Sequence, residues 1–336
     1  MINQYYDAPI LLIDSSYASF YRFYAIQLWY GFSNKEEMEE IKLSDDYDWT
    51  KNDIFMNKYE QKYMSVFDKI RKRYEIPTCN MIFAIDCPRD SIWRMKHYSS
   101  YKSNRNTEKH RKHNIKEVLK ITYSEIIPKL IEKYSVKSVK VDHAEADDVA
   151  AIIKNEIRRI QPNRKIIIVT GDLDYLQLSD SNTELINIKG ESLLKKSKGS
   201  PEKDLLTKII GGDNSDYIPA IFNKCGPKTT ERLVNNEELL NERLLQDENA
   251  RKKYELNKLL VDFNSIPTDI QKKIVLKLYS LDIIPIELKK IYFHDNGLMD
   301  CKDIITKVKV NGNGNGNGNG NDINKNIGIM KYFSVN

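Results

Sequence analysis

The sequence is poor in the residues that stabilise small secreted proteins and zinc-binding proteins. It contains four cysteines, Cys79, Cys87, Cys225 and Cys301, and no two of them form a CxxC pair. Disulfide frameworks and zinc knuckles both depend on closely spaced cysteines, so neither is expected here. We expect reduced thiols and an intracellular setting.

Long apolar runs are also missing. No stretch approaches the roughly 18 apolar residues that a membrane-spanning helix needs, and the first residues lack the order of a signal peptide. We therefore expect neither membrane insertion nor secretion. Histidine is scarce as well: the chain has five, and none stands with serine or cysteine in a recognisable catalytic motif. The sequence thus gives no sign of a histidine-based nucleophilic mechanism.

Positive charge is modest in total but uneven along the chain. The formal net charge is +5, and basic residues cluster between residues 89 and 120. Such a cluster can place positive potential where a polyanion would lie. A basic run is also commonly the solvated face of a helix, so charge alone does not identify a nucleic-acid-binding protein.

Acidic residues follow four short apolar segments that have the length of strands. These segments are residues 10–13, 81–85, the alternating pair Val139 and Val141, and residues 166–169; the acids after them are Asp14, Asp86, Glu145, Asp172 and Asp174. Helical patterns lie between them, notably over residues 115–134 and 148–160. Strands alternating with helices predict an α/β fold with a mainly parallel sheet. Ligands of such sheets bind beyond the carboxyl ends of the strands, where these acids would meet.

Three acidic clusters are dense for their positions. They are Glu145, Asp147 and Asp148; Asp172 and Asp174; and Asp213 and Asp216. A cluster at a helix start is often structural, because the helix dipole favours negative charge there. Convergence of all three in one crevice favours another explanation, since so many carboxylates repel one another unless divalent cations neutralise them. Oxygen ligands without cysteine or histidine select magnesium or manganese.

Ordered motifs over residues 10–235 resemble the flap endonuclease and 5′ to 3′ exonuclease superfamily, especially its bacteriophage and bacterial-polymerase branches. The motifs are Asp14 after the first strand, the Asp86 segment, Ala144-Glu145-Ala146-Asp147-Asp148, Thr170-Gly171-Asp172-Leu173-Asp174, and Gly212-Asp213-Asn214-Ser215-Asp216-Tyr217-Ile218-Pro219. Each block alone is weak evidence, whereas their order and spacing together are specific. The resemblance implies a PIN-like sheet flanked by helices, with a helical arch and a C-terminal module of the helix-hairpin-helix type.

The resemblance also implies a structure-specific 5′ nuclease that hydrolyses phosphodiester bonds with two Mg²⁺ ions, for which Mn²⁺ can substitute. The first metal side would comprise Asp14, Asp86, Glu145, Asp147 and Asp148, and the second would comprise Asp172, Asp174, Asp213 and Asp216. The substrates would be DNA with a 5′ flap, a nick or an RNA-primed end, in replication and repair. Two other functions stay open: a PIN-like metal-dependent ribonuclease and a noncatalytic junction-binding protein.

The segment after Asp86 resembles the family block that serves the scissile phosphate. By this resemblance Lys102 and Arg105 contact that phosphate, and Arg94 is a further candidate. Tyr101 could stack an unpaired base or pack its ring in the core. The following basic residues, Lys109, Arg111 and Lys112, match the helical arch (about residues 94–125), which would guide a single 5′ strand, although a solvated basic helix would have the same composition.

Residues 223–230 resemble the hairpin with which the family binds duplex DNA. We expect phosphate contacts here from Lys224, Gly226, Lys228 and Thr229, without base specificity. The family's first hairpin glycine is replaced by Lys224, which makes the K⁺ ion sometimes bound there doubtful in this chain.

The end of the chain alternates Asn and Gly over residues 311–321, a composition that predicts a flexible linker. Beyond it, residues 322–336 include Asn326, Ile329, Tyr332 and Phe333, which resemble a sliding-clamp-binding peptide. A C-terminal strand docking back on the body would bury the same anchors.

We expect a monomer with a nuclease core over residues 1–200 and a helical duplex-binding module over residues 201–310.

Overall fold

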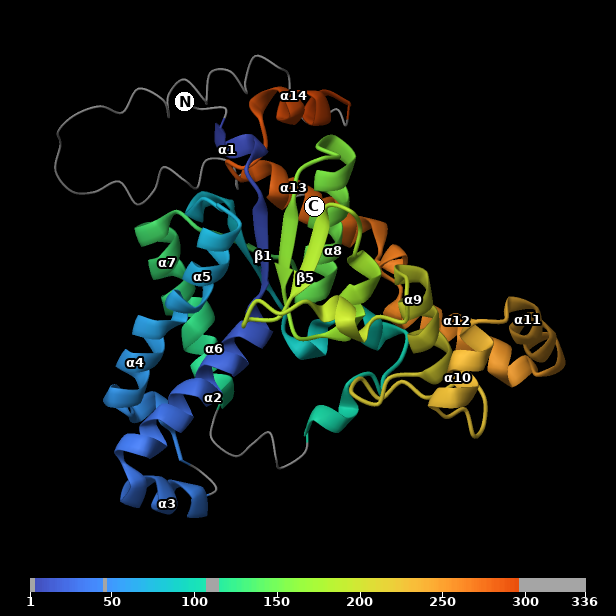
Figure 1. Ribbon diagram of the computed structural model, residues 1–336, viewed down its shortest axis with the longest axis horizontal. Coiled ribbons are helices and arrows are strands. Elements are labelled where there is room, and N and C mark those ends of the chain that lie inside the picture. The colour runs from blue at the N-terminus through green and yellow to red at the C-terminus, as the bar shows by residue number, and fades with distance from the viewer. Residues whose placement is uncertain (1–3, 45–46, 107–114, 296–336) are drawn as a thin grey trace. The chain divides into compact units, whose positions relative to one another are not determined.

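The protein is built on a five-stranded parallel sheet, seen in a computed structural model that describes residues 4–44, 47–106 and 115–295 (Figure 1). Its strands are β1 (Ile10–Asp14), β2 (Met81–Ile85), β3 (Lys137–Lys140), β4 (Ile166–Val169) and β5 (Thr183–Ile186), in the order β3-β2-β1-β4-β5. Leu12 pairs with Ile82 on one side and with Ile168 on the other. The predicted parallel α/β fold is confirmed. Strand β3 ends before Val141, and β5 was not predicted.

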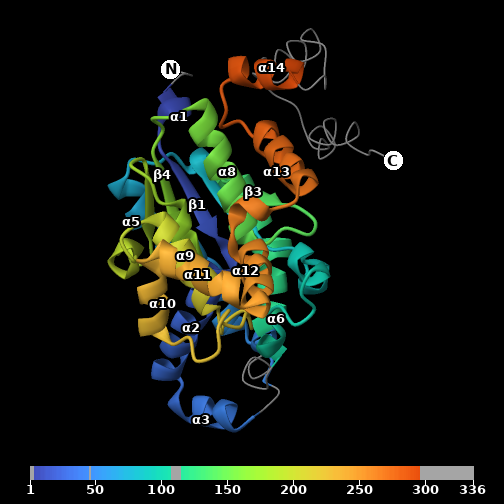
Figure 2. The same cartoon turned by 90° about the vertical axis from the view of Figure 1, so that its right-hand side faces the viewer.

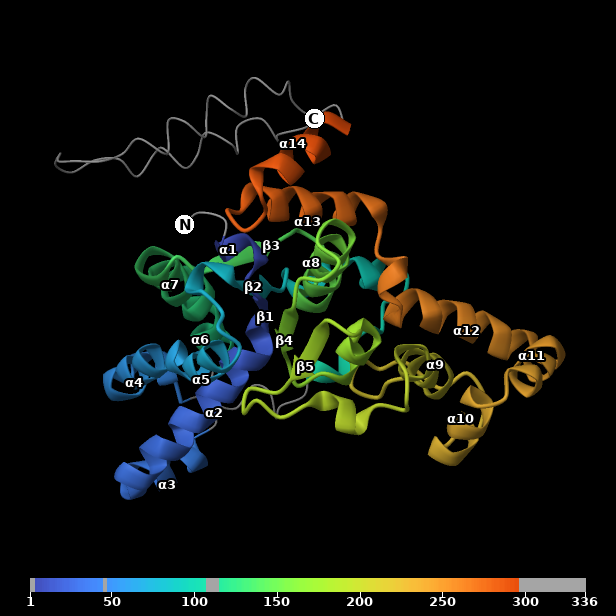
Figure 3. The ribbon, with the colours of Figure 1, turned by 45° about the horizontal axis from the view of Figure 1, so that its top comes forward.

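Helices cover both faces of the sheet (Figure 3). Helices α2 and α7 pack on one face and α8 packs on the other. The first group is α2 (Ser15–Ser33), α3 (Lys35–Leu43), α4 (Asp53–Tyr63), α5 (Ser65–Arg73), α6 (Ile115–Ile121) and α7 (Ile127–Tyr134), and α8 spans Ala146–Ile160. The predicted helix over residues 115–134 is present, with a π-helical turn, η7 (Thr122–Ile126), between α6 and α7. A short helix, α1 (Gln4–Asp7), precedes the sheet.

Aromatic side chains fill the space between α2, α4 and the sheet. Trp49 is fully buried, and its ring centroid lies 4.3 Å from that of Phe55 and 5.5 Å from that of Tyr30. Residues 29–63, for which the sequence suggested no role, therefore supply part of the core that supports β1 and β2. The acidic residues Glu36 and Glu40 of α3 are exposed.

More helices follow the sheet along the chain (Figure 2). Two apolar clusters join α9 (Pro201–Gly211), α10 (Pro227–Val234), α11 (Glu237–Gln246) and α12 (Glu248–Val261), and the first cluster also includes Cys87, Ile92 and Tyr101. Helix α13 (Thr268–Ser280) comes next in the chain. Helix α9 begins with Ser200, whose hydroxyl accepts from the Lys203 N–H at 3.3 Å, followed by Pro201 at the first position. Short 3₁₀ segments connect the main elements: η1 (Trp49–Lys51), η2 (Thr78–Asn80), η3 (Arg89–Ser91), η4 (Trp93–Lys96), η5 (Ser103–Asn106), η8 (Leu173–Leu178), η9 (Leu193–Lys196) and η10 (Phe263–Ser265).

The chain divides into two compact units, Met1–Val275 and Leu276–Asn336. The boundary expected at residue 200 lies inside the first unit. In the second, helix α14 (Ile286–Asp295) carries Tyr292, which stacks on Tyr279 with ring centroids 4.1 Å apart. The predicted linker and tail, residues 311–336, lie outside the described residues. Within the described ranges, no helix has the length and apolar character needed to cross a membrane.

Gly212 fixes the turn between α9 and the loop that carries Asp213 and Asp216. Its φ is +70°, and a Cβ there would lie 2.4 Å from the Ile218 carbonyl oxygen and 2.5 Å from the Pro219 carbonyl carbon. Both neighbours are backbone atoms and cannot move aside cheaply. Asp213 pairs with Ile218 in an antiparallel bridge directly after this turn.

We predict that Gly212→Ala lowers the free energy of unfolding by about 2 kcal/mol, because of the clash and the strained φ. Chemical denaturation measures this change. Gly226→Ala is the matched control: a Cβ at Gly226 meets no atom within 4 Å, and its φ is −77°, so the expected cost is only that of alanine at the N-cap of α10, below about 1 kcal/mol. Equal stability of the two variants would contradict the argument.

Candidate active site

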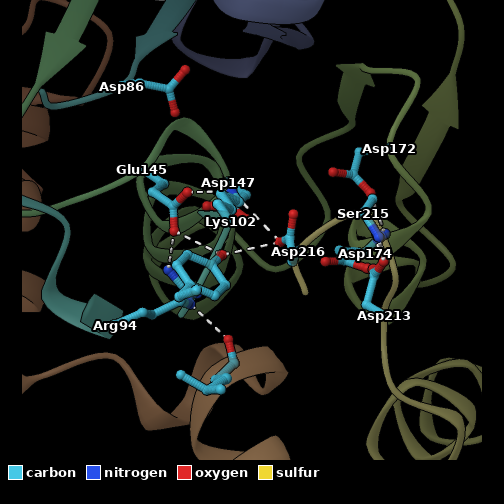
Figure 4. A network of polar contacts seen from close by, with 12 residues as sticks. Asp86, Arg94, Lys102, Glu145, Asp147, Asp172, Asp174, Asp213, Ser215 and Asp216 are labelled. Atoms are coloured by element: carbon cyan, nitrogen blue, oxygen red, sulfur yellow. Dashed lines mark hydrogen bonds and ion pairs between the residues drawn. The ribbon is translucent and has the colours of Figure 1, made fainter. Parts of the chain in front are cut away.

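An acidic cleft of about 490 Å³ opens at the carboxyl ends of β1, β2 and β4. Asp14 ends β1, Asp86 follows β2, and Asp172 lies three residues after β4. The cleft is lined by Asp14, Ser16, Tyr17, Phe20, Asp86, Lys102, Glu145, Ala146, Asp147, Gly171, Asp172, Leu173, Tyr175, Lys208 and Ser215. Acids far apart in the sequence thus meet in one place, because parallel strands bring their carboxyl ends to one edge of the sheet (Figure 4).

Asp14 is held between two elements. Its carboxylate accepts from the Tyr17 N–H at 3.0 Å, which caps α2, and from the Thr170 hydroxyl at 2.9 Å. Burial, and then the negative charge of Asp86, raise the pKa of Asp14 to about 7. In the absence of a cation, this carboxyl group is therefore partly protonated near neutral pH.

Asp86 has partners on both sides of the cleft. It accepts from the Ala146 N–H at 2.7 Å and from the hydroxyl of Ser16, which also lies 2.9 Å from the Tyr123 hydroxyl. Burial raises the pKa of Asp86 despite these hydrogen bonds. The fold accordingly holds two carboxylates at an energetic cost that a bound cation would remove.

The start of α8 brings Glu145, Asp147 and Asp148 together, with one oxygen of each within 4.8 Å of the others. Glu145 accepts from Arg94 at 2.9 Å, from the Tyr101 hydroxyl at 3.1 Å, and from Lys102. Burial opposes its ionisation, but Lys102 and Arg94 outweigh burial and lower the pKa of Glu145 to about 2. Asp147 has the opposite shift: burial, and then Glu145, raise its pKa well above the usual range.

Arg94 does not have the position predicted for it. Its guanidinium is 1% exposed and bonds both oxygens of Asp148, at 2.7 and 2.9 Å, while its Nε donates to the Leu260 carbonyl at 2.6 Å. The predicted contact to substrate phosphate is wrong for Arg94, because a buried and fully paired guanidinium cannot reach a strand in the cleft. Arg94 instead neutralises and fixes the acids at the start of α8.

Asp148 is the carboxylate with which Arg94 makes its two-oxygen ion pair. Trp93 Nε1 donates to its Oδ2 at 2.9 Å, and the Glu145 N–H donates to the same oxygen at 3.0 Å. Asp148 is fully buried and does not line the cleft. These contacts hold Asp148 beside Glu145, and because its carboxylate belongs to the same cluster of three acids, its role as a metal ligand stays a prediction.

Tyr101 is likewise buried, with 2% of its surface exposed. Its hydroxyl lies 3.1 Å from Glu145 Oε2 and 3.1 Å from Asp216 Oδ2. No ring face is open to a nucleotide, so the predicted base stacking is wrong. The apolar ring packs with Ile209 and Leu260, and the hydroxyl links two acids.

Lys102 lies in the cleft, as the sequence suggested. Its ammonium pairs with Glu145 and lies 3.6 Å from Asp216 Oδ2, and its backbone N–H donates to the Asp216 carbonyl at 2.9 Å. The residue has a φ of +57°, a left-handed conformation that lysine rarely adopts. The strained backbone directs the side chain into the acids and away from solvent.

A second acidic group comes from η8 and the loop after α9. Exposed Asp172 accepts from the Asp174 N–H at 3.0 Å, and Asp213 accepts from the Ser215 N–H and hydroxyl at 2.7 and 2.6 Å. Burial, and then Asp172, raise the pKa of Asp174 to about 7. Burial acts on Asp213 too, but the charge of Lys208 outweighs it and lowers the pKa of Asp213.

Asp216 lies between the two acidic groups (Figure 4). The resemblance assigned it to the second metal side with Asp213. In the structure its side chain contacts Tyr101 and Lys102, both of which also bind Glu145. The division of acids between two sides is thus less sharp than the motifs implied.

Lys208 is a site residue that the sequence did not reveal. It lies on α9, with its ammonium 2.6 Å from Asp174 Oδ1 and also paired with Asp213. The only signal in the sequence was a lysine five residues before Asp213, which is unremarkable in a helix as charged as α9. Each acidic group therefore contains one lysine ammonium.

The predicted DNA-binding residues are only partly described. Lys224 (φ +56°), Gly226 and Lys228 are exposed before and at the start of α10, and Thr229 is half-buried. The side chain of Arg105 and all of Lys109, Arg111 and Lys112 lie outside the described residues, as do Asn326, Ile329, Tyr332 and Phe333.

The side chains that could bind a metal ion in this cleft suit divalent cations. Among the described residues that line the cleft, the acidic side chains offer carboxylate oxygens, and none of these lining residues is a histidine or a cysteine. Hard oxygen donors of this kind suit Mg²⁺ or Mn²⁺. The paired lysines and raised carboxyl pKa values indicate how the protein tolerates these acids in the absence of such ions.

Comparison with known proteins gives a consistent result. A family model described as the 5′-3′ exonuclease, N-terminal resolvase-like domain matches residues 9–209. The 5′-3′ exonuclease of Buchnera aphidicola subsp. Schizaphis graminum is 25% identical over 229 residues, covering 66% of this chain and 68% of that protein. Ribonuclease H of Enterobacteria phage T4 is 25% identical over 312 residues, covering 89% of this chain and 95% of that protein.

Solved structures share the fold. The T5 5′-exonuclease with bound divalent metal ions (zinc) has a TM-score of 0.57 at 16% identity, over 82% of this chain and 99% of that one. A bacteriophage T5 flap endonuclease in a complex with DNA and metal ions matches with the same TM-score and coverage. Because the family model spans more than half of the sequence, the chain belongs to the 5′-3′ exonuclease family and is a 5′ nuclease that hydrolyses phosphodiester bonds.

Proposed function

We propose that this nuclease cuts DNA, or RNA paired with DNA, at a 5′ flap, a nick or an RNA-primed end, using two Mg²⁺ ions. The observation that carries the proposal is a pair of acidic groups, each paired with one of the two lysines that line the cleft. Mn²⁺ would fit the same oxygen donors. Two similar proteins, the ribonuclease H of phage T4 and a T5 flap endonuclease in complex with DNA, support substrates of this kind.

The acids would divide between two ions as follows. Asp14, Asp86, Glu145 and Asp147 would hold the first, and Asp172, Asp174 and Asp213 would hold the second, with Asp216 between them. Asp148, from the same cluster as Glu145 and Asp147, is proposed as a further ligand of the first ion, and Arg94 would orient both Glu145 and Asp148. When bound, the ions supply a water of lowered pKa and neutralise the charge that develops on the phosphate.

Both lysines of the site are paired with its acids: Lys102 with Glu145, and Lys208 with Asp174 and Asp213. Lys102 lines the cleft, where its ammonium would donate to a non-bridging oxygen of the scissile phosphate, a charge-assisted contact of the strong type. Arg105 remains the second residue proposed for this role.

Nucleic acid would approach from the side of the exposed hairpin before α10. Lys224 and Lys228 are exposed and free to contact backbone phosphates of a duplex, while Gly226 and Thr229 lie at the start of the helix. The arch residues Lys109, Arg111 and Lys112 are proposed to guide the 5′ strand. Binding of a sliding clamp by Asn326, Ile329, Tyr332 and Phe333 remains part of the proposal, as does the monomeric state.

Replacing one cleft acid tests the metal-dependent mechanism. We expect Asp172→Asn to lower the rate of cutting in Mg²⁺ by about 100-fold or more, since it removes a charged ligand, while flap binding in EDTA is retained. Matched flap, nicked, gapped and RNA-primed substrates measure both rate and preference. Asp269→Asn, which changes an exposed acid outside the cleft, should cut at the wild-type rate. A wild-type rate for Asp172→Asn would exclude the second ion from the mechanism.

Asp14→Asn separates the stability of the site from its chemistry. The pKa of Asp14 is about 7 in the folded protein and 3.8 ordinarily. The protonated carboxyl group therefore adds to the free energy of unfolding at low pH, and this contribution is lost as the pH rises through about 7. Without metal at pH 8, the variant should be more stable than wild type by on the order of 2 kcal/mol. At pH 4 the difference should nearly vanish.

Thermal unfolding at both pH values, with and without Mg²⁺, measures this effect. Mg²⁺ should stabilise the wild type at pH 8 and have little effect on Asp14→Asn, which should also fail to cut DNA. A metal-free variant that unfolds below the wild type at pH 8 would show that the Asp14 hydrogen bonds outweigh its buried charge.

Charge reversal tests the hairpin. The double variant Lys224→Glu, Lys228→Glu should bind duplex DNA about tenfold more weakly at moderate salt, with a shallower salt dependence, because two phosphate contacts are lost. Metal-dependent cutting of short single strands should persist. Lys69→Glu, Lys72→Glu on α5 makes the same change in net charge at exposed positions, so equal duplex binding by the two double variants would remove the hairpin from the DNA interface.

A further inference from the structure

Tyr175 has a buried hydroxyl group that nothing in the described part of the chain satisfies. The residue follows Asp174 directly in η8, lines the acidic cleft and is 1% exposed. Its hydroxyl makes no hydrogen bond to any described residue. Two other fully buried tyrosines differ: Tyr59 bonds the Thr122 hydroxyl and Tyr63 bonds the Ser19 hydroxyl, each at 2.9 Å.

The ring of Tyr175 is fixed and cannot turn its hydroxyl to solvent. It packs edge-to-face against Phe263 of η10, with ring centroids 6.4 Å apart. Gln177 ties the same turn of chain to this neighbour: its Nε2 donates to the Val261 carbonyl at 3.0 Å, and its Oε1 accepts from the Phe263 N–H at 3.2 Å. The position of the hydroxyl is therefore set by the fold.

Tyr175 lines the cleft together with carboxylates of both acidic groups, namely Asp14, Asp86, Asp147 and Asp172. Its phenol offers one O–H donor to this cleft. A purely structural tyrosine here would gain nothing over phenylalanine, because a buried hydroxyl without a partner carries an uncompensated loss of hydration.

We propose that Tyr175 is a positioning residue whose hydroxyl donates a hydrogen bond to a water ligand of a divalent cation held by these carboxylates. Water is the suitable partner because the hydroxyl lies too deep for the phosphate of a nucleic acid strand to reach it. Donors of this outer-sphere kind orient metal ligands and strengthen metal binding. The inference rests on the proposed two-metal function and adds a residue to it.

Tyr175→Phe tests the proposal, because it removes one oxygen and keeps the ring against Phe263. In the absence of metal, the variant should melt at the same temperature as the wild type or higher. Its affinity for Mn²⁺, measured by titration calorimetry, should be about tenfold weaker. Stabilisation of the fold by saturating Mn²⁺ should be retained, with the midpoint shifted to higher metal concentration.

Tyr74→Phe is the matched control. The Tyr74 hydroxyl donates to Glu184 at 2.6 Å outside the cleft, so this variant should lose some stability and keep wild-type Mn²⁺ affinity. Unchanged Mn²⁺ affinity in Tyr175→Phe would overturn the proposal, and so would an equal loss of stability with and without metal. If the wild type itself takes up no Mn²⁺, the proposed two-metal function fails; if wild type and Tyr175→Phe bind Mn²⁺ equally, only the role of Tyr175 fails.

Discussion

Repulsion between carboxylates is the constraint on which the rest of this structure depends. The fold gathers acids from β1, β2 and the start of α8 in one cleft, and those of η8 and the loop after α9 against the two lysines that line it. For Asp14 and Asp174, burial and the charge of a neighbouring acid both oppose ionisation. The protein meets this cost in two ways. Lys102, Lys208 and buried Arg94 neutralise part of the charge, and Asp14 and Asp174 have pKa values high enough to hold protons near neutrality.

The same repulsion explains why the buried acid Asp148 is hydrogen-bonded on both of its carboxylate oxygens. Asp148 is enclosed by Arg94, Trp93 and a backbone N–H, so a buried charge is left with no unsatisfied oxygen. Breaking such a buried pair costs far more than a surface ion pair contributes. The residues that surround the cleft are therefore as necessary to the nuclease as those that line it, because they fix where its free carboxylates stand.

The repulsion between the carboxylates of the site favours the binding of cations. An acid whose pKa is raised by its neighbours is destabilised in its charged form, and a divalent ion reverses that effect. Stability and function are opposed here, as is common where polar groups are held against one another. The aromatic core around Trp49 and the regular parallel sheet supply the rigidity that such a site requires.

The sequence by itself determined four of the five strands and their parallel sense, because short apolar runs alternating with helical patterns are local signals with a simple physical meaning. It also showed which acids follow those strands. It also determined that Lys102 lies among these acids. Only the tertiary structure decided which polar residues face the cleft and which face the core. Arg94 and Tyr101 looked like substrate contacts but are buried, whereas Lys208 and Tyr175 gave no signal. Burial depends on contacts between distant segments, such as Arg94 with Leu260 and Tyr175 with Phe263, and no local pattern encodes such contacts.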